Sequence, residues 1–183
     1  MPTIVHGFDW PDRFVVGTVG HPGSRSFYLQ ARTGVRVVSV ALEKEQSAVL
    51  AHGVEEILDE LMAAEGNPFS IPAATPVELV DNDPLDQPVE PEFRAGVMRL
   101  GWDPTTAQVV VEAYPIDDSD DDIDPDGEHE PAESLEVRIP VGTARAFAKR
   151  TLEVVGAGRP LCPFCGAPMD PGGHVCAGPG ASW

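Results

Sequence analysis

Apolar and polar positions alternate along the first 42 residues, with short turns between the alternating runs. The pattern predicts strands over residues 13–19, 26–31 and 35–42. The first two are joined by a turn at His21-Pro22-Gly23-Ser24 and the last two by Arg32-Thr33-Gly34. Enrichment in β-branched residues and turns this short favour an antiparallel meander.

The spacing of apolar residues changes after residue 43 and becomes helical. Leu50, Val54, Ile57, Leu58 and Leu61 share one face, while acidic residues occupy the opposite face. This arrangement predicts an amphipathic helix over about residues 44–65 that ends at Gly66.

The same order of elements recurs in the second half of the chain. Strands are predicted over residues 93–100, 106–114 and 135–140, and a helix over residues 143–155. The apolar face of that helix consists of Ala144, Phe147, Ala148, Leu152 and Val155. Phe14-Val15-Val16-Gly17 matches Phe93-Arg94-Ala95-Gly96 in register, so an internal duplication and chance similarity between amphipathic strands both stay open.

These elements predict an α+β fold. Two βββα halves, residues 1–66 and 92–157, would form a mostly antiparallel six-stranded sheet, or two sheets of three strands, covered by the two helices. A single fused domain is favoured because about 60 residues alone make a marginal core. Residues 67–91 contain six prolines and are predicted to be an extended, acidic linker without secondary structure.

The net charge of −18 is concentrated in two segments. Residues 78–92 contain six acidic residues, residues 117–136 contain eleven, and neither segment contains Lys or Arg. The other 13 of the 30 acids face 12 Lys and Arg, so the rest of the chain is nearly neutral. We expect the two acidic segments to stay solvated rather than fold, and such a charge opposes binding to nucleic acid.

All three cysteines lie in the tail, residues 158–183, where Cys162 and Cys165 precede His174 and Cys176. Two thiolates with two residues between them, followed by an imidazole and a third thiolate, are typical ligands of tetrahedral Zn²⁺. A disulfide is the alternative, but an odd number of cysteines without a secretion signal favours reduced thiols. The tail is therefore predicted to be a zinc knuckle, and four protein ligands make its metal structural.

Basic residues suggest a second kind of site. Arg25, Arg32 and Lys44 belong to the first half and Arg150 to the second, so related halves would place them around one cleft that binds an anion or a phosphate. The alternative is that these side chains neutralise the acidic segments. The chain contains no P-loop, dinucleotide fingerprint, nucleophile elbow or HExxH motif.

Two weaker patterns in the sequence have simpler explanations than a functional site. His6, Asp9 and Asp12 would suit a pocket for acid or base chemistry, but we favour a polar, frayed start of the chain. The acids between Asp122 and Glu133 have the spacing of a calcium loop, which the prolines there oppose. No apolar run has membrane-spanning length and residues 1–10 do not resemble a secretion signal, so we expect a cytoplasmic protein.

Several segments resemble an actinobacterial family of domains of unknown function, DUF3090. They are Asp12-Arg13-Phe14 through Gly20, Phe27 through Arg32, Leu42 through Gln46, Arg145-Ala146-Phe147, and the tail from Gly158 through Cys176. The resemblance covers nearly the whole chain. It implies a cytosolic bacterial protein and supplies no catalytic residues.

Together these observations predict a zinc-stabilised, non-catalytic binding or adaptor protein with a protein partner and no membrane association. The alternative is an enzyme or binder that acts on a phosphorylated or anionic small molecule. Arg25, Arg32, Lys44 and Arg150 would line its cleft.

Overall fold

Seven strands form one sheet in the computed structural model, which describes residues 4–20, 24–116 and 133–156. The strands are β1 (Ile4–Asp9), β2 (Arg13–Val19), β3 (Ser26–Thr33), β4 (Arg36–Leu42), β5 (Pro91–Asp103), β6 (Gln108–Pro115) and β7 (Glu133–Pro140). Their order is β1-β7-β6-β5-β4-β3-β2, with β1 parallel to β7, β4 parallel to β5 and the other neighbours antiparallel. The predicted α+β class and mostly antiparallel sheet are confirmed.

The predicted count of six strands is wrong because the start of the chain is strand β1 rather than a frayed segment. Its backbone is in register with β7 from Ile4 opposite Glu133 to Asp9 opposite Arg138. Only Phe8 of this strand is fully buried, so the apolar alternation that reveals the other strands is weak here.

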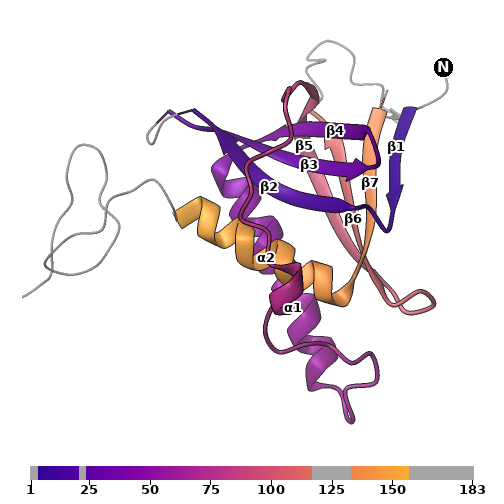
Figure 1. The fold of residues 1–183 in the computed structure, drawn as a ribbon. Coiled ribbons are helices and arrows are strands. Elements are labelled where there is room, and N and C mark those ends of the chain that lie inside the picture. The colour runs from indigo at the N-terminus through magenta and orange to yellow at the C-terminus, as the bar shows by residue number, and fades with distance from the viewer. Residues whose placement is uncertain (1–3, 21–23, 117–132, 157–183) are drawn as a thin grey trace, which may run out of the picture.

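The sheet is strongly curled, as Figure 1 shows. Strands β1 and β2 stand at opposite ends of the strand order, yet only residues 10–12 connect them. In this connection the Trp10 N–H donates to the Arg138 carbonyl and the Asp12 N–H to the Arg32 carbonyl. The Arg36 guanidinium at the start of β4 also donates to the Gly7 carbonyl, which brings the two ends of the sheet together.

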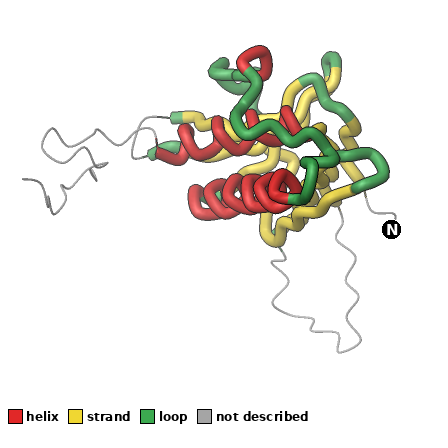
Figure 2. Tube along the Cα trace, turned by 90° about the horizontal axis from the view of Figure 1, so that it is seen from below, coloured by secondary structure: helices red, strands yellow, loops and turns green. Residues whose placement is uncertain are grey.

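Two helices, α1 (Lys44–Ala63) and α2 (Val141–Gly156), lie side by side against the open side of the curled sheet (Figures 1 and 2). The start of α1 is fixed by Gln46, whose amide accepts from the Glu43 N–H and donates to the carbonyls of Ala95 and Gly96. Both predicted helices are confirmed, because their apolar stripes have a surface to cover.

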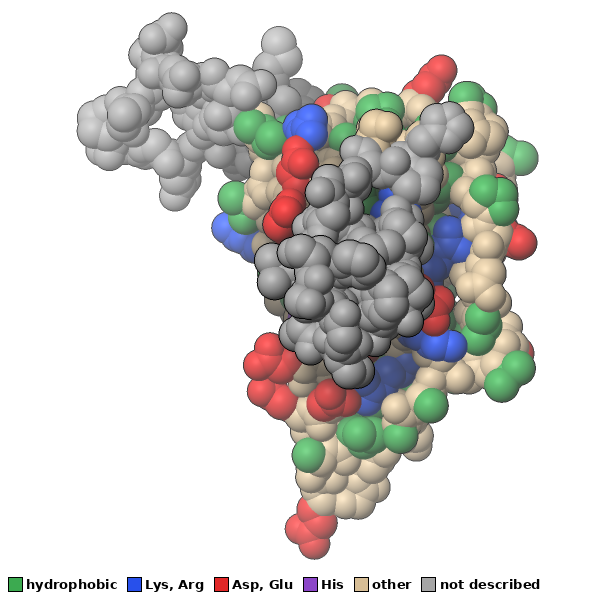
Figure 3. Space-filling view, turned by 90° about the vertical axis from the view of Figure 1, so that its left-hand side faces the viewer, with side chains coloured by type: hydrophobic (Ala, Val, Ile, Leu, Met, Phe, Trp, Pro, Cys, Tyr) green, Lys and Arg blue, Asp and Glu red, His purple; other side chains and the backbone are tan. Residues whose placement is uncertain are grey.

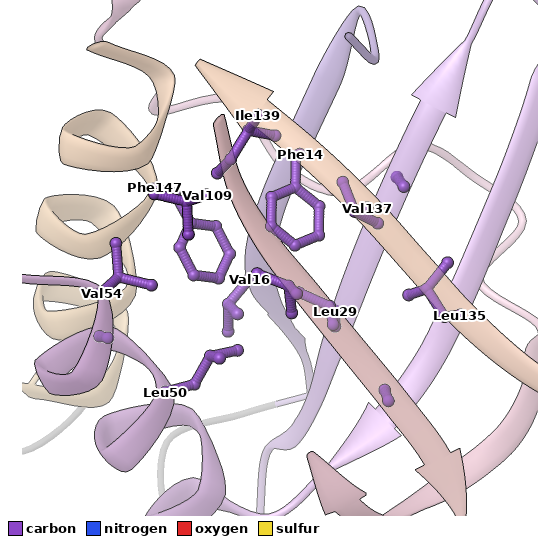
Figure 4. Packing of buried hydrophobic residues seen from close by; sticks show 14 of the residues in the cluster. Phe14, Val16, Leu29, Leu50, Val54, Val109, Leu135, Val137, Ile139 and Phe147 are labelled. Atoms are coloured by element: carbon purple, nitrogen blue, oxygen red, sulfur yellow. The ribbon is translucent and has the colours of Figure 1, made fainter. Parts of the chain in front are cut away.

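The core lies between the inner face of the sheet and the helices, and Figure 4 shows part of it. Phe14 and Phe147 are stacked with ring centroids 4.5 Å apart, which joins β2 to α2. The cluster also includes Val16, Leu29, Leu50, Val54, Val109, Leu135, Val137 and Ile139. Ala144 and Ala148 of the predicted α2 face are fully buried, whereas Leu152 and Val155 pack at its margin.

The linker between α1 and β5 is held on the body at Asp81, Leu85 and Asp86, whereas most other residues of the acidic segment 78–92 are exposed. It contains one short helix, η1 (Val77–Leu79), and then runs beside β2 (Figure 1). Leu85 is 4% exposed, and Arg13 and Arg32 bind the acids on either side of it. The ion pairs with Arg13 and Arg32 of the sheet offset the repulsion among the acidic side chains of the linker.

The structure describes no helix whose length and hydropathy would suit it to crossing a lipid bilayer, a finding that covers residues 4–20, 24–116 and 133–156. The zinc-knuckle tail and most of the second acidic segment lie outside the described residues.

Candidate functional site

Arg13 is the centre of a network that ties the linker to strand β2. Its side chain is 8% exposed and donates from Nε and Nη2 to both carboxylate oxygens of Asp81, at 2.7 and 3.1 Å. The Nη2 group also donates to the Asp83 carbonyl, and Nη1 to Asp86 at 3.2 Å. The forked geometry of Arg suits such bidentate binding, so four hydrogen bonds from one side chain order the acidic segment.

Two further arginines extend this network on either side. Arg32 of β3 donates to the other carboxylate oxygen of Asp86 at 2.9 Å. Arg150 of α2 donates to both the carbonyl and the carboxylate of Asp81, at 2.7 and 3.1 Å. Arg32, Asp86, Arg13, Asp81 and Arg150 therefore form a chain of alternating charge, which we call the arginine–aspartate network.

Arg150 also protects the edge of the sheet. Strand β2 ends the strand order, and its Val16 carbonyl accepts a 3.0 Å hydrogen bond from Arg150 Nε. The Arg150 side chain is 10% exposed, so this contact is shielded from water. An edge strand covered in this way is less available for pairing with another chain.

A neutral contact holds the same linker on the outer face of the sheet. The Gln30 amide accepts from the Asp86 N–H at 2.8 Å and donates to the Asp86 carbonyl at 3.1 Å. Gln30 is 1% exposed and also donates to Ser39. The Gln30 amide thus pairs with the Asp86 backbone as a neighbouring strand would, and it satisfies the N–H and carbonyl groups of Asp86.

The network stabilises the charged forms of Arg13 and Asp81, but not that of Arg150. Burial alone would raise the pKa of Asp81, but the hydrogen bonds from Arg13 and from the Asp83 N–H outweigh it and hold that pKa below its ordinary value of 3.8. The hydrogen bond with Asp81 raises the pKa of Arg13. Burial lowers the pKa of Arg150, although Asp81 acts in the opposite direction.

A cavity of about 100 Å³ lies where β2, η1 and α2 meet. Its lining includes Arg13, Asp81 and Arg150, together with Leu79, Thr143 and Phe147. Pockets for drug-sized ligands are about 300 Å³ or larger. The cavity is therefore too small for a nucleotide or a cofactor as it stands.

The four predicted anion-binding residues occupy different places. Arg32 and Arg150 belong to the arginine–aspartate network. Arg25 donates to the Val154 carbonyl at 3.3 Å and lies over the Phe27 ring, and Lys44 is the first residue of α1. The structure thus brings two of the four into one network, and binding of an external anion by the set stays a prediction. Figure 3 shows both basic side chains (Lys and Arg) and acidic side chains (Asp and Glu) on one face of the molecule.

The polar residues near the N-terminus do not form one pocket. Asp9 accepts a 2.8 Å hydrogen bond from Gln108, and Asp12 accepts one of 2.7 Å from the Gly34 N–H. His6 lies instead beside Glu133, with Nε2 3.1 Å from Oε2. The two aspartates therefore fasten strand ends, and only His6 faces another titratable side chain.

Sequence reasoning missed the acidic partners of both groups, Asp81 and Asp86 in the network and Glu92 near His6. Glu92 and Glu133 have carboxylate oxygens within 4.8 Å of each other and of a His6 ring nitrogen. The predicted ligands Cys162, Cys165, His174 and Cys176 lie outside the described residues, so the zinc site stays a prediction.

Comparison with known proteins gives one match. No curated protein and no solved structure matches this chain. A family model described as "Protein of unknown function (DUF3090)" matches residues 6–176, which include the network, His6 and all four predicted zinc ligands. By that match the chain belongs to the DUF3090 family.

Proposed function

We propose that this protein is a non-catalytic binding or adaptor protein with a structural zinc ion in its C-terminal tail. The observation that carries the proposal is the internal use of the buried arginines. Arg13 donates to Asp81, to Asp86 and to the Asp83 carbonyl. Arg150 donates from Nε and Nη1 to the Val16 carbonyl and to Asp81. A site built for an external anion needs donors that a ligand can reach.

The zinc part of the proposal rests on the ligand set Cys162, Cys165, His174 and Cys176. Four protein ligands leave Zn²⁺ no position for water or substrate, so its role would be to fold the tail. Elemental analysis of the purified chain should find bound zinc, and Cys165→Ser should lower the content by about one zinc per chain. A zinc-free protein would count against this part alone.

Trp10 supports a role in protein binding. Its side chain is 62% exposed, although its backbone is fixed by the hydrogen bond to Arg138. Val5 of β1, the strand that directly precedes Trp10, is 54% exposed. Tryptophan is enriched among residues that dominate binding energy at protein interfaces, and a fixed backbone lowers the entropy lost on binding.

Affinity capture from the native lysate tests the adaptor role. We expect the full chain to retain a protein that is lost with Trp10→Ala or after truncation at Gly158, with Val49→Ala, another exposed apolar position, as the control. If the variants and the full chain retain the same proteins, neither Trp10 nor the tail is the contact surface.

The second candidate, a binder of small anions, is favoured by the two guanidinium groups that line the cavity. Inorganic phosphate and nucleotides would be screened by thermal denaturation. A ligand at a hundred times its Kd should raise Tm by roughly 5–10 °C in a chain of this size. A shift that disappears in Arg150→Met, which removes a guanidinium group from the cavity lining, would favour this candidate, and no shift would favour the adaptor.

A further inference from the structure

His6, Glu92 and Glu133 come from three strands that are distant in sequence. His6 is in the middle of β1, Glu133 begins β7, and Glu92 is the second residue of β5. The parallel pairing of β1 with β7 places His6 opposite Leu135, two residues from Glu133. The N-terminal strand therefore completes this group when it closes the curled sheet (Figure 1).

The pairing of β5 with β4 is irregular at Glu92, the third residue of the group. Pro91 pairs with Ser39 and Phe93 with Val40, so Glu92 has no partner residue on β4. A bulge of this kind interrupts the alternation of side chains and redirects the extra residue. Glu92 is accordingly within reach of His6 although the adjacent Phe93 is buried in the core.

We propose that His6, Glu92 and Glu133 bind one divalent transition-metal ion. One ligand atom from each residue lies within 4.8 Å of the other two. An ion with ligands at 2.0–2.2 Å needs ligand atoms roughly 3.4 Å apart. Nε2 of His6 and Oε2 of Glu133 are 3.1 Å apart, which is close to this separation. Glu92 is exposed, so its side chain is free to move closer to them.

Charge balance favours a cation at this point. The carboxylates of Glu92 and Glu133 approach each other. Within the described part of the chain, the ion-pair partner of Glu133 is His6, and Glu92 forms no ion pair with Lys or Arg. The side chains of His6 and Glu133 are 16% and 25% exposed, so water screens the Glu133 carboxylate incompletely. In sequence, residues 117–132 add nine acidic residues and no basic one directly before Glu133, which increases the attraction for cations.

The chemistry of the ligands separates this site from the cysteine tail. One imidazole and two carboxylates suit Mn²⁺ and Zn²⁺, whereas three thiolates and an imidazole favour zinc over manganese. Three protein ligands also leave at least one position for water, unlike the four ligands of the tail. The site is independent of the adaptor role proposed above.

Manganese is the appropriate probe because it discriminates against the thiolates of the tail. The full chain would be freed of metal with a chelator and titrated with Mn²⁺, while free ion is followed by electron paramagnetic resonance. We expect one saturable site whose affinity falls at least about tenfold in Glu133→Gln and in His6→Ala, since even loss of a group that only orients a ligand costs about that much.

Two controls identify the location. Glu112→Gln removes a carboxylate from the neighbouring strand β6 and Cys162→Ser disables the tail, and both should retain the affinity of the unaltered chain. Amide resonances of Gly7 and Ser134, next to the proposed ligands, should broaden on addition of Mn²⁺. Glu133→Gln preserves side-chain shape, so it tests the proposal even if His6→Ala weakens the pairing of β1.

Three results would overturn the proposal. They are an unchanged Mn²⁺ affinity in Glu133→Gln, broadening confined to residues 117–132, and loss of the site in Cys162→Ser. The first two would mean that Mn²⁺ associates with the acidic segment only, and the third would assign the ion to the tail.

Discussion

Leu85 of the linker occupies the space that a side chain on Gly17 of β2 would need. A Cβ atom built on Gly17 would lie 2.5 Å from both Cγ and Cδ2 of Leu85. Because Leu85 is only 4% exposed, its side chain has little room to move aside. The absence of a side chain at position 17 therefore allows the linker to pack on the sheet.

Gly17→Ala should destabilise the protein by about 1–3 kcal/mol, the usual cost of overpacking. Urea unfolding measures this free energy. Gly7→Ala on β1 is the control, since no atom lies within 4 Å of its built Cβ, and it should change stability by less than about 0.5 kcal/mol. In Gly17→Ala combined with Leu85→Ala the two costs should not add. Simple additivity would contradict the contact.

Arg13→Met should lower the free energy of unfolding by about 2–3 kcal/mol. The change removes the bidentate contact with Asp81 and one hydrogen bond to Asp86, which leaves Asp81 with Arg150 and Asp86 with Arg32 as their remaining basic partners in the network. Lys149→Met is the control, because its ion pair with Glu153 is more than half exposed and should contribute less than about 0.5 kcal/mol. Equal effects of the two changes would mean that the linker does not depend on Arg13.

The pH dependence of stability should include a contribution from Asp81. Its pKa is lower in the folded protein than in the unfolded chain, so above about pH 5 both states are ionised and its stabilisation is complete. As the pH falls below that value, the unfolded chain takes up the proton first and the free energy of unfolding decreases. This loss continues until the pH is below the folded pKa.

Urea unfolding at pH 6 and at pH 3 tests this dependence. Asp81→Asn should make the protein less stable at pH 6 and reduce the difference between the two pH values. Glu56→Gln, an exposed position on α1, is the comparison and should preserve the difference. An acid dependence as steep in Asp81→Asn as in the unaltered chain would show that its ion pairs contribute nothing.

Phe147→Ala should cost about 3–5 kcal/mol, because the ring is 1% exposed and stacked on Phe14. Phe147→Leu keeps most of the volume and should cost much less. Thermal denaturation followed by circular dichroism ranks the two variants. A similar loss in both would assign the effect to the stacking of the rings rather than to the cavity that alanine leaves.

The elements that sequence reasoning predicted are those with a regular apolar period. Leu50, Val54 and Leu58 of α1 are at most 2% exposed, as their helical spacing indicated. Strand β1 lacks such a period, since Ile4 and Val5 are exposed and Gly7 has no side chain. Its position depends on hydrogen bonds with β7, which no local pattern reports.

The contacts of the acidic linker could not be predicted for a different reason. Arg13 and Asp81 are 68 residues apart, and composition alone assigns a run of acids to solvent. Glu92 and Glu133 likewise come together only through the order of the strands. A single sequence identifies residues capable of ion pairing or metal binding, but the topology determines which of them meet.

The pairing of β1 with β7 also restricts how the chain can acquire its shape during synthesis. Residues 4–9 are synthesised well before their partners, residues 133–138, so the nascent strand must wait until the chain has been made as far as β7. Contacts this distant in sequence slow folding because a long loop has to close before they form. Strand β1 precedes the other six strands of the sheet in sequence, yet it is the last that can join them.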